Sequence, residues 1–437
     1  MFRCTVCAYV HEGPEPPATC PVCGVGPELF EPVGGSAVPA TPSALRDGPR
    51  IVVLGAGIAG CAAAEAARAQ DPTATITLVG AEEGLPYRRI DLTRLLAGRV
   101  SERDLVLHDR VWFERQGIDL VNGRARHVEL EARRVLLGTG RALSFERLVL
   151  ATGAHAFVPP WPGIWRVGVS ALRDLATARR VLGLASPGVR AVVVGGGLLG
   201  LEAAAGLAAR GLAVTVLEGH AWLLPRQLPE PAGAVLAKHL GALGVAVRCG
   251  VQVRELAGDE EVRAVILTDG TAVQAELVLV AVGVRPNLNL AADAGIAVGR
   301  ALQVDPSMRT SHPRVWAAGD LVEVAGQAWG LWAVAQEQGR VAGIGAAGGE
   351  ARFDPPTSVT TLKVLDLAVT SVGDLSGEGA VLHEERGAGR YLRVVAREGR
   401  LVGACLVGHP DLAGPLTAAV RERRSVTSAT SLLGPPA

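Results

Sequence analysis

Neither sign of charge is in excess in this 437-residue sequence, because Lys plus Arg and Asp plus Glu both total 43. Without a basic stripe, we expect no nucleic-acid partner and no anionic membrane partner, and a small substrate instead. A long apolar run is also missing. The start MFRCTVC has no apolar stretch behind a basic segment, and the most apolar later region is interrupted by Glu202 and Arg210. We therefore expect a cytoplasmic protein.

Short apolar runs alternate with Ala-rich stretches over much of the chain, which is longer than the roughly 250 to 300 residues of a single core. The runs are IVVL from Ile51, ITLV from Ile76, RLVLATG from Arg147, AVVV from Ala191, AVTVL from Ala213 and LVLVAVG from Leu277. Continuous apolar strands separated by helices indicate parallel sheets covered on both faces. Strand, glycine loop and helix follow one another twice, which predicts two nucleotide-binding domains. Past Arg352, short alternating runs predict a smaller α+β domain.

Four of the seven cysteines form two C-x-x-C pairs, Cys4 with Cys7 and Cys20 with Cys23. In a reducing compartment such pairs are typical of metal ligands rather than disulfides. Four thiolates can close a tetrahedron around iron or zinc. The stretch CTVCAYVHEGPEPPATCPVCG resembles rubredoxin-like domains, in particular the short type attached to rubrerythrins, and this resemblance implies iron. A structural zinc is the alternative. The Pro-, Gly- and Ala-rich residues 35–49 that follow are typical of a linker.

The first glycine loop contains Gly55, Gly57 and Gly60 and lies between the strand IVVL and the helix CAAAEAARAQ. These glycines permit a tight turn, let the backbone approach a pyrophosphate and let the helix pack closely, while the helix N-terminus faces the anion. Glu82 follows the next strand, where a ribose-binding carboxylate is needed. A solvated turn residue is the alternative interpretation of Glu82.

The second glycine loop contains Gly195, Gly197 and Gly200, and Glu218 ends the following strand. A carboxylate at this point can bind both ribose hydroxyls and repels a 2′-phosphate. Because Gly219 rather than Arg or Lys follows Glu218, the sequence favours NADH over NADPH. Two dinucleotide sites in one chain are explained most simply by a resident flavin and a transient nicotinamide.

From about Arg50 to Arg400 the chain resembles the pyridine nucleotide-disulfide oxidoreductase superfamily. Within it, NAD(P)H:rubredoxin reductases and the flavin portion of assimilatory nitrite reductase are the most similar. The segments LVLATGAHAFVPPWPG, VAVGVRPN and VWAAGD support the resemblance. It implies that Asp320 contacts the ribityl chain of FAD and that Thr152 and Gly153 lie near the FAD.

Further candidate residues follow from the same resemblance. The segment PYRRIDLTRLLAG resembles the stretch beside the flavin ring, which implies that Arg89 and Arg94 lie near the isoalloxazine; most relatives have lysine in place of Arg94. Glu202 stands where relatives have a glutamate that faces the nicotinamide, with a solvated helix position as the alternative. The segment WAVAQEQG implies that Trp332 covers the nicotinamide site, with a core position as the alternative.

Redox cysteines are missing where relatives that reduce disulfides or peroxides have them. The stretch after the first glycine loop has no closely spaced pair, and PYRRIDLTRLL has no cysteine. Cys61 follows Gly60 directly and is expected to be packed rather than exposed to substrate. Electrons are therefore expected to leave the flavin without a cysteine relay.

These observations predict an α/β protein with two Rossmann-like domains of the glutathione-reductase type, a small N-terminal metal knuckle and a small C-terminal α+β domain. The predicted parts are a rubredoxin-like domain at 1–34, a linker at 35–49, an FAD domain at 50–160 and 281–350, an NAD domain at 161–280 and a C-terminal domain at 351–437.

The function expected from this combination is electron transfer from NADH through FAD to the chain's own rubredoxin-type iron and on to an external acceptor. The acceptor is either a redox protein or a small oxidant, and the chain is a monomer or a homodimer. One alternative is an NADH-dependent flavin reductase that serves a separate partner, such as a nitrite reductase module or oxygen, with zinc in the cysteine site. The other is an NADH-sensing flavoprotein with an interaction role.

Overall fold

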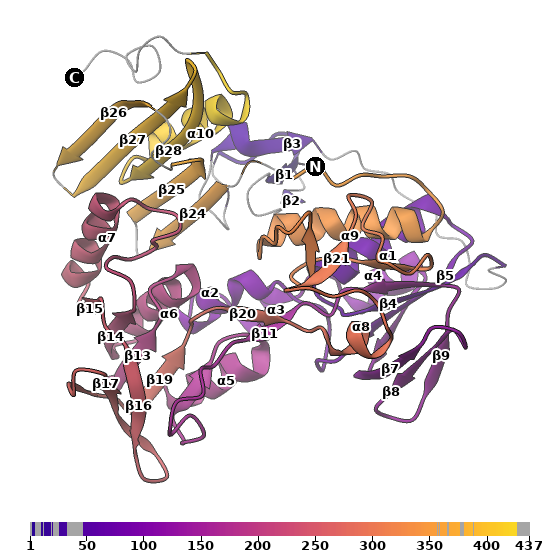
Figure 1. The fold of residues 1–437 in the computed structure, drawn as a ribbon, viewed down its shortest axis with the longest axis horizontal. Helices are drawn as coiled ribbons and strands as arrows, with labels where there is room; N and C mark the ends of the chain where they lie inside the picture. The colour runs from indigo at the N-terminus through magenta and orange to yellow at the C-terminus, as the bar shows by residue number, and fades with distance from the viewer. Residues whose placement is uncertain are drawn as a thin grey trace.

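The computed structural model describes most of the chain (Figure 1). The described residues are 2–4, 10–11, 13–18, 20, 26–32, 47–355, 357, 359–364, 367–375, 380–387 and 389–425. Among them, no helix is both long enough and apolar enough to cross a membrane. Cys7, Cys23 and most of the predicted linker lie outside the described residues.

The first parallel sheet has the strand order β22-β10-β4-β5-β6, and the first glycine loop leaves its central strand β4. Val53 of β4 is fully buried and lies between Val149 and Leu78 of the neighbouring strands. The main elements are β4 (Arg50–Leu54), α1 (Ile58–Gln70), β5 (Thr75–Gly80), β6 (Ile118–Asn122), β10 (Arg147–Leu150) and β22 (Val315–Ala317). The loop therefore opens at the carboxyl edge of the sheet, where ligands bind in such folds.

Helix α9 (Trp332–Ala346) packs against α1 in direct backbone contact (Figure 1). A Cβ atom at Gly339 would lie 2.1 Å from the carbonyl oxygen of Ala59, and one at Gly343 would lie 2.1 Å from that of Ala63. Only glycine permits this approach. The close packing fixes the beginning of α9, with Trp332 as its first residue, beside the beginning of α1.

Short elements complete this part of the molecule. They are η2 (Arg89–Asp91), α2 (Leu92–Leu96), α3 (Glu102–Leu105), α4 (Arg110–Gln116), α8 (Asn289–Asp293), the paired strands β21 (Leu302–Val304) and β23 (Val322–Val324), and the three-stranded sheet of β7 (Ala125–Glu129), β8 (Arg134–Leu137) and β9 (Ala142–Ser144).

The second parallel sheet has the order β12-β19-β13-β14-β15 and repeats the design of the first. Its elements are β12 (Val169–Ala171), α5 (Leu175–Leu184), β13 (Arg190–Val194), α6 (Leu198–Ala209), β14 (Ala213–Glu218), α7 (Glu230–Ala242), β15 (Ala246–Cys249) and β19 (Leu277–Val280). A smaller sheet of β16 (Val253–Gly258), β17 (Val262–Leu267) and β18 (Ala272–Gln274) lies beside it. The antiparallel pair β11 (Ala154–Ala156) and β20 (Val284–Pro286) joins the two parallel sheets.

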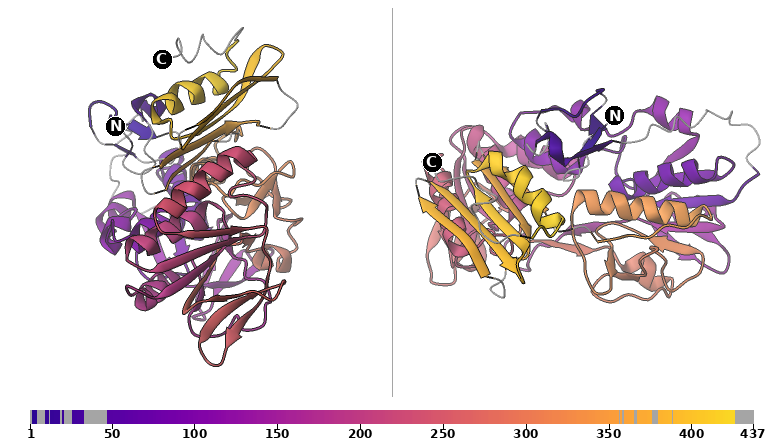
Figure 2. Two further views of the ribbon diagram at one scale, coloured as in Figure 1. Left: turned by 90° about the vertical axis from the view of Figure 1, so that its left-hand side faces the viewer. Right: turned by 90° about the horizontal axis from the view of Figure 1, so that it is seen from above.

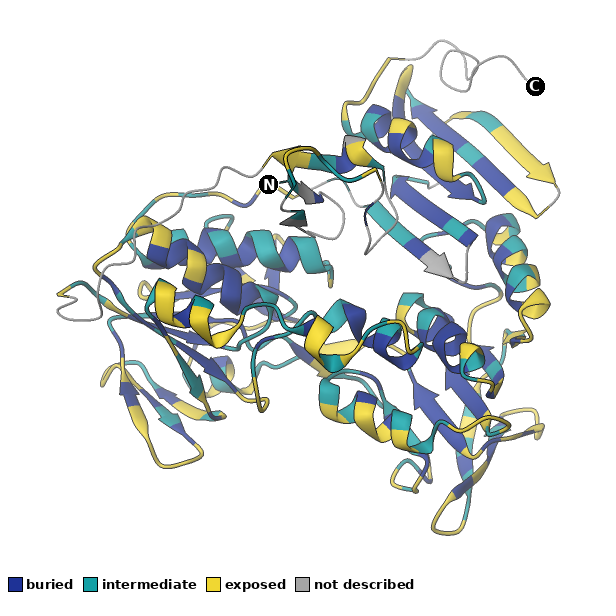
Figure 3. Cartoon of the chain, turned by 180° about the vertical axis from the view of Figure 1, so that it is seen from behind, coloured by how far each residue is buried: buried dark blue, intermediate teal, exposed yellow. Residues whose placement is uncertain are grey.

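The C-terminal part is an antiparallel sheet of order β24-β25-β28-β27-β26 with α10 packed on it. Its elements are β24 (Val359–Val364), β25 (Leu367–Gly373), β26 (Ala380–Gly387), β27 (Arg390–Arg397), β28 (Arg400–Val407) and α10 (Pro410–Arg421). The edge strand β26 is largely exposed (Figure 3), whereas Val407 of β28 shares one buried cluster with Leu236 of α7. The C-terminal sheet and the second parallel sheet therefore share a core.

The N-terminal part is a small antiparallel sheet of order β2-β1-β3. Its elements are β1 (Phe2–Cys4), β2 (Val10–His11), η1 (Pro27–Leu29) and β3 (Phe30–Pro32). It lies next to α10 rather than apart from the rest of the molecule (Figure 2). The predicted fold class, with two Rossmann-like sheets and a small additional part at each end, is confirmed.

Candidate functional site

A cavity of about 1580 Å³ extends from the first glycine loop past α6 to the C-terminal sheet. Most residues predicted from the sequence to form the site lie in its wall. These are Cys20, Gly55, Gly57, Glu82, Arg89, Arg94, Thr152, Gly153, Glu202, Asp320 and Trp332. Gly195, Gly197, Gly200 and Glu218 are not in this wall, although Leu198 and Leu199 next to the second loop are.

The first glycine loop has the stereochemistry that a dinucleotide site requires. Gly55 has φ +113°, and a Cβ atom there would lie 2.1 Å from the carbonyl oxygen of Ala151. At Gly60 a Cβ atom would lie 1.7 Å from the carbonyl oxygen of Gly55, so this glycine serves close packing. At Gly57, which caps the thirteen-residue helix α1, a Cβ atom would meet nothing within 4 Å. The open space at a helix N-terminus fits the pyrophosphate of a dinucleotide.

The second glycine loop repeats this geometry. Gly195 has φ +115°, a Cβ atom at Gly200 would lie 2.0 Å from the carbonyl oxygen of Gly195, and one at Gly197 would meet nothing within 4 Å. Glu218 is 7% exposed and accepts a hydrogen bond from the backbone N–H of Gly196 at 2.7 Å. The other carboxylate oxygen accepts a hydrogen bond from the backbone N–H of His220 at 2.8 Å, so Glu218 is held between the second glycine loop and His220.

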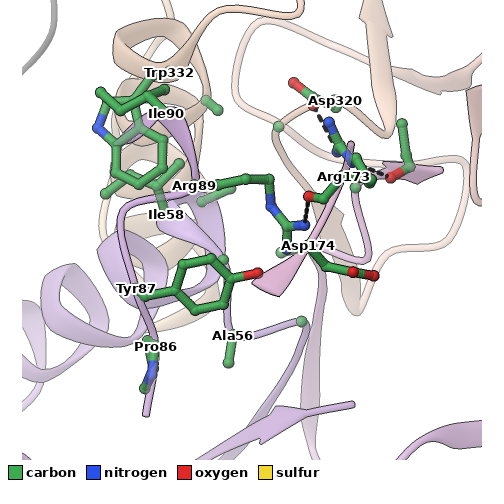
Figure 4. Close-up of a pocket in the computed structure, with 18 of the residues that line it drawn as sticks. Ala56, Ile58, Pro86, Tyr87, Arg89, Ile90, Arg173, Asp174, Asp320 and Trp332 are labelled. Carbon is green, nitrogen blue, oxygen red and sulfur yellow. Dashed lines mark hydrogen bonds and ion pairs between the residues drawn. The ribbon is translucent and has the colours of Figure 1, made fainter. Parts of the chain in front are cut away.

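Glu82 is part of a polar cluster with Tyr87 and Arg89. The hydroxyl of Tyr87 donates to Glu82 and accepts from the backbone N–H of Leu175 at 3.0 Å, and burial raises the pKa of that hydroxyl. Arg89 forms an ion pair with Glu82. It also donates to the carbonyl of Arg173 (Figure 4). Neither the role of Tyr87 nor the pairing of Glu82 with Arg89 was predicted from the sequence. Their proximity depends on the turn after β5, which the residue pattern does not reveal.

Asp320 is held by Arg173, a residue that sequence reasoning missed. Arg173 Nη2 lies 3.0 Å from Asp320 Oδ2, and its Nε donates to the carbonyl of Ala154 at 2.8 Å (Figure 4). Gly319, with φ +84°, donates its N–H to the buried Gln338 of α9 at 3.0 Å. The carboxylate is thereby oriented into the cavity from three elements that are distant in the sequence.

Glu202 lies in the cavity wall where α6 packs against α2. Its Oε2 accepts a hydrogen bond from the hydroxyl of Thr93 at 2.8 Å, and desolvation raises the pKa of the carboxyl despite this bond. Arg94 Nη1 lies 3.3 Å from Oδ1 of the buried Asp91. The protein thus brings Arg94 and Glu202 into one cavity but pairs Arg94 with Asp91, a partner that the sequence did not suggest.

Trp332 begins α9 at the same end of the cavity. It is half-buried, and Figure 4 shows its ring beside Ile58 and Ile90. An indole with one face on apolar side chains and the other toward the cavity can cover a flat ligand.

Two of the four predicted metal ligands are described, and both are buried. Cys4 and Cys20 are each 1% exposed. Cys20 also lies in the wall of the cavity that contains the first glycine loop. Buried cysteines fit a thiolate-bound metal.

Cys61 has a different environment from the predicted metal ligands. It is 1% exposed, its thiol contacts the carbonyl of Ala56 at 3.7 Å, and burial raises the pKa of the thiol. The expectation that Cys61 is packed is confirmed. A buried thiol with a raised pKa does not act as a nucleophile.

Comparison with known proteins identifies the family. Residues 49–339 match the model of the pyridine nucleotide-disulphide oxidoreductases. The chain belongs to this family. Residues 2–31 match the rubredoxin-like domain of rubrerythrin, and residues 359–424 match the C-terminal domain of rubredoxin NAD+ reductase. Membership implies an FAD-dependent oxidoreductase that uses NAD(H), as the sequence predicted.

Two curated relatives and one solved structure show how far the similarity extends. A nitrite reductase [NAD(P)H] of Bacillus subtilis (strain 168) is 35% identical over 88% of this chain and 49% of its own length. An NADH-rubredoxin oxidoreductase of Clostridium acetobutylicum is 27% identical over 88% of this chain and 97% of its own length. The crystal structure of NADH:rubredoxin oxidoreductase from Clostridium acetobutylicum has a TM-score of 0.73 and 26% identity, and covers 89% of this chain and 99% of that one. The chain spans about half the length of the first two curated relatives it matches.

Proposed function

We propose that this protein oxidises NADH with FAD as the resident cofactor and delivers the electrons to a thiolate-bound iron in its own N-terminal part. An external redox protein or small oxidant then receives them. The observation that supports this proposal most directly is that Cys20 lies in the wall of the cavity formed by the first glycine loop. A metal ligand and the flavin-binding loop thus face one space.

The donor side of the proposal rests on two dinucleotide sites, of which the first lines the cavity and the second adjoins it through Leu198 and Leu199. Gly57 and the N-terminus of α1 bind the pyrophosphate of FAD, and Asp320 binds its ribityl chain. Gly197 and Glu218 hold the NADH, and Glu202 with Trp332 orients the nicotinamide. FAD, when bound, accepts a hydride and can release electrons singly, which makes a one-electron acceptor compatible with NADH.

The acceptor side rests on the cysteines. Among the described cysteines, only Cys20 lines the cavity, and Cys61 is packed in the core with a raised pKa. A cysteine relay of the disulfide-reductase kind therefore has no support within the described residues. Iron bound by four thiolates changes by one electron, whereas zinc does not change its oxidation state.

A second candidate function is supported by the similarity to nitrite reductase [NAD(P)H]. In that case the flavin serves a separate partner, and the cysteines hold a structural zinc. Metal analysis of the purified protein separates the two candidates.

An anaerobic titration with NADH tests the proposal. We expect the flavin absorbance to bleach first and the iron–thiolate absorbance second, with only the second change lost in Cys4→Ser. Cys405→Ser is the control, because Cys405 is buried in the C-terminal sheet and does not line the cavity. A protein without flavin, or a metal whose spectrum never responds to NADH, would contradict the proposal.

A further inference from the structure

The C-terminal helix α10 contacts two parts of the molecule. One face packs on the antiparallel sheet through Leu416, Ala419 and Val420, which are all buried. The same helix lies beside the N-terminal part (Figures 1 and 2). It contacts η1, in which Leu29 is 4% exposed. The N-terminal part is therefore seated on the C-terminal part, although the two are at opposite ends of the sequence.

Arg421, the last residue of α10, lies at this junction. It lines the same cavity as Cys20. Burial lowers the pKa of its guanidinium, and the nearby negative charges of Cys4 and Glu31 oppose this lowering. A half-buried cation thus lines the same cavity as the predicted metal ligand Cys20.

A cation in this position affects a thiolate-bound metal in two ways. Reduction adds one negative charge to the site, and a nearby positive charge favours the more negative form. The attraction between Arg421 and Glu31 also favours the position in which the N-terminal part is seated on α10. Both effects increase electron delivery to the metal.

We propose that Arg421 is a positioning residue that seats the N-terminal part on α10 and raises the reduction potential of its metal centre. This proposal rests on the proposed function and assigns a role to the C-terminal part: α10 is the docking surface for the chain's own electron acceptor.

A simpler role for Arg421 has to be separated from this one. A cation in the last turn of a helix also stabilises the helix dipole. The chain offers a matched control in Arg424, which follows α10, is exposed and forms an ion pair with Glu422 at 2.8 Å. Arg424→Gln removes the same charge at the same end of the molecule without touching the junction.

The experiment compares Arg421→Gln, Arg421→Lys and Arg424→Gln in the full-length protein with iron and FAD bound. The metal potential is measured by equilibrium titration with redox dyes, and seating is measured by hydrogen exchange of residues 26–32. We expect Arg421→Gln to lower the potential and to accelerate exchange by about tenfold, which corresponds to about 1.4 kcal/mol. Arg421→Lys retains the potential because it retains the charge, and Arg424→Gln matches the unmodified protein in both measurements.

The outcomes distinguish this inference from the proposed function. If Arg421→Gln leaves both the potential and the exchange unchanged, or if Arg424→Gln changes them equally, the role of Arg421 is refuted. If the iron of the unmodified protein never responds to NADH, the proposed function fails. The exchange and dye measurements do not use NADH, so they still decide the role of Arg421.

Discussion

Two single alanine substitutions in the first glycine loop are expected to have different effects: Gly60→Ala should reduce the stability of the fold, and Gly57→Ala should weaken cofactor binding. At Gly60 the added Cβ atom would lie 1.7 Å from the carbonyl oxygen of Gly55, so the backbone has to move. Overpacking of this kind costs up to about 3 kcal/mol. At roughly 2–4 °C per kcal/mol, the Tm of the flavin-free protein should fall by up to about 6–12 °C in Gly60→Ala.

At Gly57 the opposite result is expected. The added Cβ atom meets no atom within 4 Å, and the backbone at φ −78° and ψ −174° is open to any residue. Stability of the flavin-free protein should be unchanged or higher by about 0.4–1 kcal/mol, because alanine restricts the unfolded chain. The methyl group nevertheless enters the space proposed for the pyrophosphate, so FAD affinity should fall at least about tenfold, or 1.4 kcal/mol.

Calorimetry of the flavin-free proteins and fluorescence titration with FAD measure the two effects. The second loop provides the matched pair. Gly197→Ala should keep FAD but weaken NADH binding, whereas Gly200→Ala should destabilise the fold, since its Cβ atom would lie 2.0 Å from the carbonyl oxygen of Gly195. If Gly57→Ala binds FAD as tightly as the unmodified protein, the assignment of FAD to the first loop is wrong.

Three further predictions concern charged residues. Burial raises the pKa of Glu202 in the folded protein above its ordinary value of 4.5. The unfolded chain therefore loses this proton at a lower pH than the folded protein does, and the free energy of unfolding falls as the pH rises from 4.5 through the folded-state pKa. Glu202→Gln should therefore match the unmodified protein in urea unfolding at pH 4 and exceed it at pH 8, by on the order of 1 kcal/mol or more; equal differences at both pH values would contradict this. Arg173→Gln should cost about 1 kcal/mol, since its half-buried pair with Asp320 is screened by solvent, and should reduce bound flavin per chain; full retention of flavin would argue against the role of Asp320. Glu218→Ala should raise kcat/KM for NADPH relative to NADH at least about tenfold, and an unchanged ratio would remove Glu218 from the ribose site.

Features predicted correctly from the sequence depend on contiguous residues. The two glycine loops follow β4 and β13 and open α1 and α6, because glycine at positive φ and the start of an apolar helix are encoded within about ten residues. Burial of Cys61 follows from its place directly after a glycine that packs on the loop.

Features that the sequence could not predict join residues that are far apart in the chain. Arg173 and Asp320 are separated by 147 positions, and Thr93 and Glu202 by 109. Nothing near Arg173 or Thr93 distinguishes it from other polar residues. Arg94 was expected at the flavin ring, but its ion pair with Asp91 depends on how η2 meets α2.

The sequence alone therefore determined two Rossmann-like units and a cysteine cluster, since local backbone stereochemistry and cysteine spacing depend on adjacent residues. Only the tertiary structure brought Cys20 and Arg421 into the wall of the cavity that contains the first glycine loop. That proximity arises because the C-terminal sheet shares a core with the second parallel sheet and its helix α10 reaches the N-terminal part. It is decided by the packing of whole sheets, which no short segment encodes.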